Sequence, residues 1–302
     1  MKIAISGGSG FIGTKLSDVL IDEGHEVFIL TRSLAGKENK ERLTFVKWLT
    51  DGAQPALELE GIDAIVNLAG ESIGDGRWTK ERKKQILQSR IDATNAVIDL
   101  ISTLKKKPEV IVNASAIGYY GNSETETFTE QSNPVNQGFL ATVVKRWEET
   151  ASRAAEYGVR TVYTRIGIVL HKEEGALPRM LLPYKILVGG TIGSGKQWLS
   201  WIHIDDVIGM MLFALKEPSI EGPFNLTAPN PVQMKPFGKA LADVTNRPHW
   251  APAPAIALKI MLGEMSTLVL DGQRVLPEIA KKMAYPYKFQ ELKPALENLL
   301  KK

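Results

Sequence analysis

Three glycines near the start of the chain are spaced to bind the phosphates of a nucleotide. The apolar stretch Ile3-Ala4-Ile5 is followed by Gly7, Gly10 and Gly13. This order is typical of a strand that turns sharply, approaches a pyrophosphate with bare backbone, and continues into a helix packed closely on a sheet. The N-terminus of such a helix offers free N–H groups to phosphates. We therefore predict dinucleotide binding by Gly7, Ser9, Gly10, Phe11, Ile12 and Gly13.

The end of the second expected strand indicates which dinucleotide binds. A glycine triplet alone also fits an ordinary tight turn, but an amphipathic helix and a strand at 26–30 follow it in order. An NAD site places Asp or Glu about twenty residues past the turn, on the ribose hydroxyls. This chain has Thr31-Arg32 there, and a guanidinium pairs with a 2′-phosphate that a carboxylate would repel. We predict NADP bound by Thr31 and Arg32, with Lys37 and Arg42 adding positive charge; the alternative is a solvated Arg32.

A further apolar run, from Ala64 to Gly70, ends in small residues. Parallel strands that are buried on both faces read as continuous apolar runs, and their ligands lie beyond the carboxyl ends. We therefore expect Leu68, Ala69 and Gly70 to face the cofactor. The loop at 71–78 is either a lip of the site or an ordinary solvated loop.

Several segments resemble one family. The Gly-x-x-Gly-x-x-Gly spacing with Phe11-Ile12 resembles the fingerprint of extended short-chain dehydrogenases/reductases, the NAD(P)-dependent epimerase/dehydratase group, and 201–207 and 222–227 resemble its His-Val-Asp-Asp-Val and Tyr-Asn-Ile segments. The tail, 248–302, is similar to that of an atypical epimerase-like subgroup sometimes labelled as cell-division inhibitors. The resemblance implies a Rossmann-type doubly wound parallel sheet with a smaller mixed α/β C-terminal lobe.

The resemblance also implies catalytic residues, and here the sequence departs from the pattern. In the family a serine at the position of Ser115 holds the substrate oxygen, while a Tyr-x-x-x-Lys pair on the next helix moves the proton that hydride transfer requires. This helix has Lys145 but Ala141 four residues before it. Either Tyr119 or Tyr120 has taken over the proton transfer, or the protein does not run standard hydride chemistry. We predict catalytic roles for Ser115, Tyr120 and Lys145; Lys145 also fits a surface or ribose-contacting role.

Two arginines complete the predicted cofactor site. Arg90 stands where the family commonly has Asn, and it either faces a phosphate or ribose or makes a surface salt bridge. Arg165 matches the family's Arg-x-Gly turn beside the nicotinamide.

Two other motifs are set aside. Residues 190–197 nearly spell a phosphate loop, but Gln197 lacks the hydroxyl that ligates magnesium and no helical pattern follows. We read 173–200 as a substrate-covering loop. Asp205 and Asp206 are read as N-caps of the helix that follows them, so no metal site is predicted.

The length and composition of the chain limit the kinds of site and partner that it can have. It has 302 residues, a net charge of +3 and no cysteine, which excludes disulfides and thiolate metal sites and gives no support to nucleic acid as a partner. No apolar run is long enough to span a membrane, and no signal peptide is expected. We expect a cytoplasmic monomer or homodimer. The expected domains are an NADP-binding unit at 1–170, with 201–221 returning to it, and a smaller lobe at 171–200 and 222–302.

Two functions of different class follow. One is an NADP-dependent oxidoreductase or epimerase that acts on a small hydroxyl or carbonyl compound, which is favoured if Tyr119 or Tyr120 lies within hydrogen-bond distance of Ser115 beside the nicotinamide. The other is a non-catalytic NADPH-binding regulator, which is favoured if Tyr119 and Tyr120 both point into the core.

Overall fold

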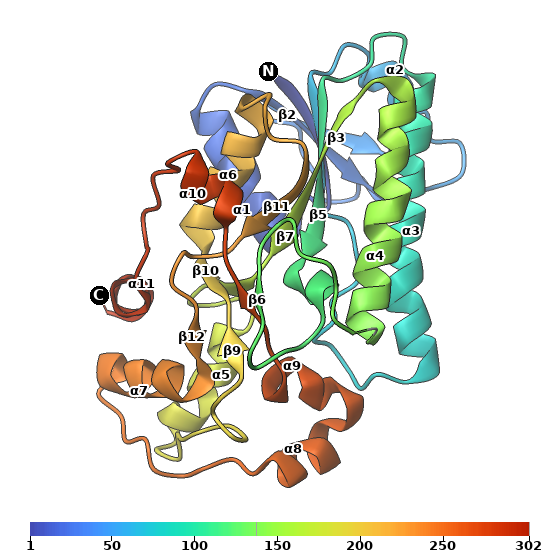
Figure 1. The fold of residues 1–302 in the computed structure, drawn as a ribbon. Helices are drawn as coiled ribbons and strands as arrows, with labels where there is room; N and C mark the ends of the chain where they lie inside the picture. Colours follow the sequence, from blue (N-terminus) through green and yellow to red (C-terminus); the bar gives the residue numbers. More distant parts are fainter. Residues whose placement is uncertain (137, 302) are drawn as a thin grey trace.

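The computed structural model describes residues 1–136 and 138–301. The larger of its two lobes is built around a seven-stranded parallel sheet (Figure 1). The strand order is β11-β7-β5-β4-β1-β2-β3. The order reverses between β1 and β4, which is where a doubly wound sheet binds its ligand. The expected Rossmann-type fold is confirmed. The strands are β1 (Lys2–Ser6), β2 (Glu26–Thr31), β3 (Leu43–Lys47), β4 (Ala64–Asn67), β5 (Val110–Ala116), β7 (Arg160–Ile166) and β11 (Gly222–Leu226).

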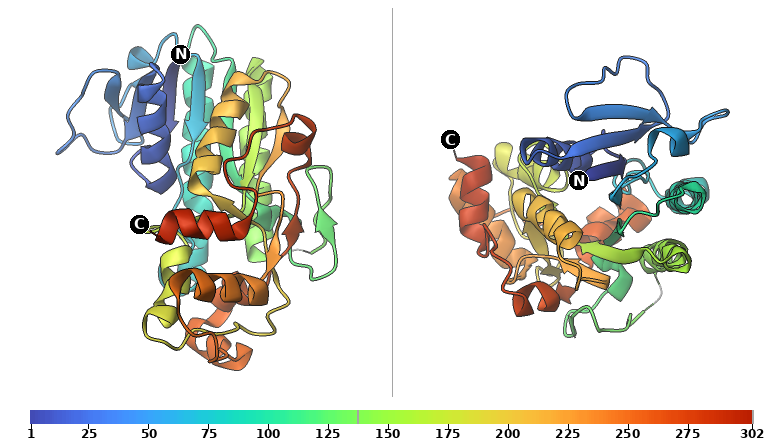
Figure 2. Two further views of the ribbon diagram at one scale, coloured as in Figure 1. Left: turned by 90° about the vertical axis from the view of Figure 1, so that its left-hand side faces the viewer. Right: turned by 90° about the horizontal axis from the view of Figure 1, so that it is seen from above.

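Helices cover both faces of this sheet because its strands carry apolar side chains on both sides. Ile3 and Ile5 of β1 pack toward α1 (Phe11–Asp22) and α6 (Ile204–Lys216), whereas Ala4 packs toward α3 (Lys80–Thr103). α4 (Phe139–Ala151) runs beside α3 (Figures 1 and 2). The smaller helices on this side are α2 (Pro55–Glu58) and η2 (Ser152–Tyr157).

A smaller lobe lies beyond the carboxyl ends of the strands, at the bottom of Figure 1. Its core contains Trp201, Phe237 and Leu296, all fully buried. The lobe consists of two two-stranded sheets and three helices: β8 (Ile168–Leu170) with β10 (Trp201–His203), β9 (Trp198–Leu199) with β12 (Val232–Gln233), α5 (Leu177–Lys185), α7 (Met234–Thr245) and α11 (Leu292–Leu300).

The chain from 255 to 282 connects the lobe back to the large sheet. Met265 packs in one cluster with Trp78, with Ile86 of α3 and with Val143 of α4. The segment comprises α8 (Ala255–Leu262), η3 (Gly263–Ser266), α9 (Thr267–Leu270), β13 (Arg274–Val275), which pairs with β6 (Thr127–Phe128), and α10 (Glu278–Lys282). No helix within the described residues is both long and apolar enough to cross a membrane.

The domain boundaries differ from the expected ones. Residues 222–226 form β11, the edge strand of the large sheet, although we expected them in the small lobe. Ala280 of α10 belongs to the core of the large sheet as well. Residues 173–200 are not a plain loop, because they contain α5 and β9.

Two elements end at glycines. The chain divides into β7 and β8 at Gly167, where a side chain would collide with the backbone of Ser200. Helix α8 ends at Gly263, whose φ of +60° is accessible to glycine but costly for other residues.

Candidate cofactor site and buried polar network

The glycine turn is built so tightly that two of its positions admit no side chain. Gly7 has φ +70°, and a Cβ there would lie 2.8 Å from the carbonyl carbon of Leu68. A Cβ on Gly13 would overlap the carbonyl oxygen of Gly7. The turn is closed by the Gly10 N–H, which donates to that same oxygen at 3.0 Å. The turn after β1 therefore touches the chain at Leu68 and Ala69, just past the end of β4.

The N-terminus of α1 leaves amides without a partner in the helix. Gly10 is the N-cap residue, and the first bond inside the helix runs from Thr14 N–H to Gly10 O. The three amides before Thr14, those of Phe11, Ile12 and Gly13, belong to the unpaired donors of a helix start. Ser9 and Gly10 are exposed. This arrangement suits an anion.

Arg32 is exposed at the end of β2, and the described residues include no ion-pair partner for it. Thr31 fixes the chain just before it, since its hydroxyl donates to Ser33 O at 2.9 Å. Arg42 does not add to the charge there. Its carbonyl accepts from Val27 N–H at the start of β2, so Arg42 lies at the amino ends of the strands, whereas Arg32 lies at the carboxyl ends. The expectation that Arg42 adds positive charge beside Arg32 was wrong.

Arg90 lies against the loop after β4. Its Nη1 donates to Glu71 O at 3.0 Å and to Ile86 O at 2.9 Å, and a Cβ on Gly70 would be 3.0 Å from its side chain. Burial lowers the pKa of Arg90 to about 10. No carboxylate within the described chain pairs with Arg90, so the surface salt bridge is not formed; contact with a cofactor remains a prediction.

Ser115 lies in a buried polar network rather than on an open surface. Its side chain is only 3% exposed, and the hydroxyl donates to Glu148 Oε1 at 2.5 Å. Arg165, its register partner on β7, donates to both oxygens of Glu148 at 2.8 Å. Both side chains are therefore occupied by protein partners. The expected substrate contact of Ser115 and cofactor contact of Arg165 need a different arrangement from this one.

Tyr120 was predicted as the proton donor, and the structure contradicts this. The side chain is fully buried in η1 (Ile117–Tyr120). Its hydroxyl donates to Asn225 Oδ1 at 2.7 Å and accepts from Arg165 Nη1 at 3.0 Å. Burial raises the pKa of Tyr120 to about 12, although Arg165 acts in the opposite direction. Because the hydroxyl is enclosed and both of its hydrogen bonds go to protein groups, it is not open to a substrate in this arrangement.

Tyr119 is half-buried and covers Arg165, whose guanidinium carbon lies 3.5 Å from the centre of the Tyr119 ring. Lys145 is exposed on α4, and Ala141 is buried one turn before it. The structure forms no hydrogen bond between Lys145 and Ser115. A catalytic role for Lys145 remains a prediction.

Sequence reasoning missed Glu148, which holds this network together. Burial alone would lower the pKa of Arg165, but Glu148 outweighs it and raises the pKa. The signal was present in the helix, because Ala141, Val144 and Glu148 recur at helical spacing on its buried face. A carboxylate on such a face requires a buried partner.

Asp205 and Asp206 do not cap α6. The N-cap is His203, whose Nδ1 accepts from Asp205 N–H at 3.1 Å. The fully buried Asp206 instead accepts from the amides of Lys288 and Phe289, at 2.8 and 3.0 Å. The described residues contain no group of acidic, histidine or cysteine side chains suited to a metal.

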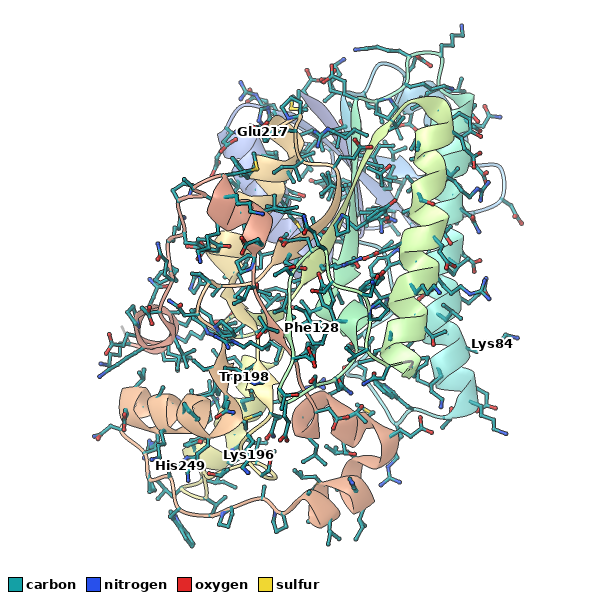
Figure 3. The ribbon with its side chains drawn as sticks, viewed as in Figure 1. Lys84, Phe128, Lys196, Trp198, Glu217 and His249 are labelled. Atoms are coloured by element: carbon teal, nitrogen blue, oxygen red, sulfur yellow. The ribbon has the colours of Figure 1, made fainter. Side chains whose placement is uncertain are left out.

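The near-match to a phosphate loop is structural. Gln197 is followed by strand β9, and its side chain donates to the carbonyl oxygens of Ile192 and Val269. Figure 3 places Lys196 and His249 in the small lobe, at the opposite end of the molecule from Glu217 at the end of α6.

Comparison with known proteins agrees with this geometry. The model of the NAD-dependent epimerase/dehydratase family matches residues 3–226. The chain belongs to this family. A domain of unknown function, DUF1731, matches residues 253–299, which covers the whole segment at 255–282 and nearly all of α11.

Relatives of the family match almost the whole chain. The epimerase family protein YfhF of Bacillus subtilis is 48% identical over 300 residues, 99% of this chain and 98% of its own. The crystal structure of the human epimerase family protein SDR39U1 with NADPH superposes with a TM-score of 0.86 at 31% identity, covering 99% of both chains. UDP-glucuronic acid 4-epimerase from Bacillus cereus has the same fold, with a TM-score of 0.79 at 16% identity, covering 99% and 98%.

Proposed function

We propose that this protein binds NADPH at the carboxyl edge of β1, β2 and β4, and acts as an NADP-dependent epimerase or oxidoreductase on a small hydroxyl or carbonyl compound. The observation that carries the proposal is the exposed Arg32 beside a glycine turn with free amides, where an NAD site would have a carboxylate. The NADPH held by the human SDR39U1 structure supports the choice of cofactor.

Different residues bind different parts of the cofactor. The amides at the start of α1 hold the pyrophosphate, and the bare backbone of Gly7 and Gly10 lets it approach. Arg32 pairs with the 2′-phosphate. Leu68, Ala69 and Gly70 line the adenosine side, with Arg90 behind Gly70. When bound, NADPH supplies a hydride.

The protein's own contribution to proton transfer rests on Lys145, because Tyr120 is enclosed. Lys145 is the exposed member of the predicted set. Ser115 acts through Glu148 as a positioning residue that fixes β5 against α4.

A second candidate is a non-catalytic NADPH-binding regulator. Two observations favour it: Ala141 stands where the family's tyrosine is expected, and Tyr120 points into the core. A panel of small carbonyl compounds, incubated with NADPH deuterated at C4, separates the two. Deuterium in any product supports an enzyme, whereas tight NADPH binding without transfer across the panel supports the regulator.

The cofactor preference is tested with Arg32→Asp. We expect the wild type to bind NADPH ten- to a hundred-fold more tightly than NADH, because a charge-assisted pair contributes roughly 1.5–3 kcal/mol. The variant should reverse the order, and the wild-type preference should weaken with salt. Calorimetric titration measures both. Arg42→Asp, which changes the same charge at the opposite edge of the sheet, should leave the preference intact. Equal affinities for NADH and NADPH in the wild type would contradict the proposal.

A further inference from the structure

We propose that His171 is a ligand of the cofactor's pyrophosphate, carried to the glycine turn by the loop at 171–176 of the small lobe. This inference rests on the proposed NADPH binding and adds to it a residue from the other lobe. It was not among the residues predicted from the sequence.

The loop lies directly against the first turn of α1. His171 follows the last residue of β8, and its ring centre is 5.1 Å from that of Phe11, the first residue of α1. Gly175 closes the same loop by bridging back to Leu170, and a Cβ at Gly175 would lie 3.5 Å from the Phe11 ring. Two points of the loop therefore contact the residue that opens the phosphate-binding helix.

The hydrogen bonds of the imidazole determine which nitrogen faces outward. His171 Nδ1 accepts from the amides of Glu173 and Glu174, at 3.3 and 3.2 Å. A nitrogen that accepts carries no proton, so the neutral ring carries its proton on Nε2. Nε2 lies on the other side of the ring from Nδ1 and is thus turned away from its own loop. The side chain is half-buried, and no described residue accepts from Nε2. The loop thus holds an N–H donor, without a protein acceptor, beside a helix N-terminus.

One lysine and three carboxylates lie near His171, so the charged side chains around it are of both signs. Lys15 lies one turn along α1 from Phe11, and burial together with Lys15 lowers the pKa of His171. The carboxylates that act in the opposite direction belong to Glu173 and Glu174 of the loop and Asp205 of α6, and the buried His203 is a neighbour as well. A bound pyrophosphate would raise the pKa of His171, as those carboxylates do. Binding should therefore be coupled to proton uptake.

The test compares NADPH with 2′-AMP, which has the adenosine 2′-phosphate but no pyrophosphate. We expect His171→Ala to weaken NADPH binding about ten-fold, the loss of one charge-assisted hydrogen bond, and to leave 2′-AMP binding within two-fold. His171→Gln should fall between, because its amide still donates. The control is His25→Ala, at the start of β2 on the opposite edge of the sheet, where the side chain bonds to the N-terminal amine. This control should bind both ligands as the wild type does.

The pH dependence supplies a second measurement that a purely structural role would not change. Wild-type affinity for NADPH should rise, relative to His171→Ala, as the pH falls from 8 to 6. NADPH affinity within two-fold of wild type in folded His171→Ala, or an equal loss for NADPH and 2′-AMP, would overturn the inference while leaving NADPH binding intact. A wild type that binds neither ligand would overturn the proposed function and this inference with it.

Discussion

At the scale of single residues, the three glycines of the turn after β1 are not equivalent. Gly7 and Gly13 are needed by the fold, because a side chain on either would press into backbone. Gly10 is exposed, and a Cβ there would meet only the carbonyl oxygen of Gly7, at 3.2 Å. Gly10 is therefore the position where function and folding can be separated.

We predict that Gly10→Val abolishes NADPH binding and lowers the free energy of unfolding by only about 1 kcal/mol, because the branched side chain occupies the path of the pyrophosphate. Calorimetric titration and urea unfolding measure the two effects. Gly13→Val is the matched comparison and should unfold the protein or nearly so. Unchanged NADPH affinity in a folded Gly10→Val variant would show that the cofactor lies elsewhere.

Tyr120, in the buried network, resembles a catalytic residue in the sequence but has a structural role. Tyr120 follows a serine at a strand end, as a catalytic residue does, yet its hydroxyl connects Arg165 to Asn225 inside the protein. A buried hydroxyl with two partners contributes to stability, and its removal leaves those partners unsatisfied.

Tyr120→Phe should therefore lower the free energy of unfolding by about 1–3 kcal/mol and change NADPH affinity by less than two-fold. Chemical denaturation and titration provide the values. Tyr119→Phe is the control, because no described residue hydrogen-bonds to the Tyr119 hydroxyl, and it should change stability little. Loss of turnover at unchanged stability in Tyr120→Phe would restore Tyr120 to catalysis.

At the scale of elements, the first turn of α6 anchors the segment before α11. Asp206 is fully buried and accepts from the amides of Lys288 and Phe289, while the preceding Tyr287 donates to Thr227 O at 3.1 Å. Burial raises the pKa of Asp206. One carboxylate thus supplies the acceptors for a piece of chain that has no regular secondary structure.

Asp206→Ala should cost about 1.5–3 kcal/mol of stability, because two amides lose a charged acceptor, and should expose the chain near Tyr285 and Tyr287 to chymotrypsin. Thermal unfolding and limited proteolysis measure these effects. Asp205→Ala removes a carboxylate that is exposed and only 3.5 Å from Lys288 Nζ, a surface pair that contributes little. Similar proteolysis in both variants would contradict the anchoring role of Asp206.

At the scale of the whole molecule, the chain crosses between the two lobes repeatedly. It leaves the large sheet after β7, returns as α6 and β11, leaves again through α7 and returns as α10. In the left view of Figure 2, α6 and α10 lie beside the sheet, whereas α7 lies below it. Neither lobe is a continuous stretch of chain, so we expect both to unfold together.

NADPH at a hundred times its Kd should raise the free energy of unfolding by about 2.7 kcal/mol, and calorimetry should show one transition that shifts as a whole. NADH at the same concentration should stabilise less, because it lacks the 2′-phosphate. Two transitions, with only the earlier or later one shifted by NADPH, would contradict the coupling of the lobes.

Local features of the sequence determined the sheet, most of its helices and the glycine turn after β1. The turn at Gly7, Gly10 and Gly13 could be predicted because strand, turn and helix follow one another within a few residues, where backbone geometry depends on local sequence. The family also followed from such short motifs, with the tail at 248–302 extending the match.

Only the tertiary structure decided where the polar side chains point. Ser115, Glu148, Arg165 and Asn225 come from β5, α4, β7 and β11, and their hydrogen bonds form only when the sheet assembles. Adjacent strand residues face opposite sides of a sheet, so a motif at a strand end does not reveal whether its serine or tyrosine is open or enclosed. The same holds for His171, which reaches Phe11 because β8 leaves the large sheet and carries its loop to the start of α1.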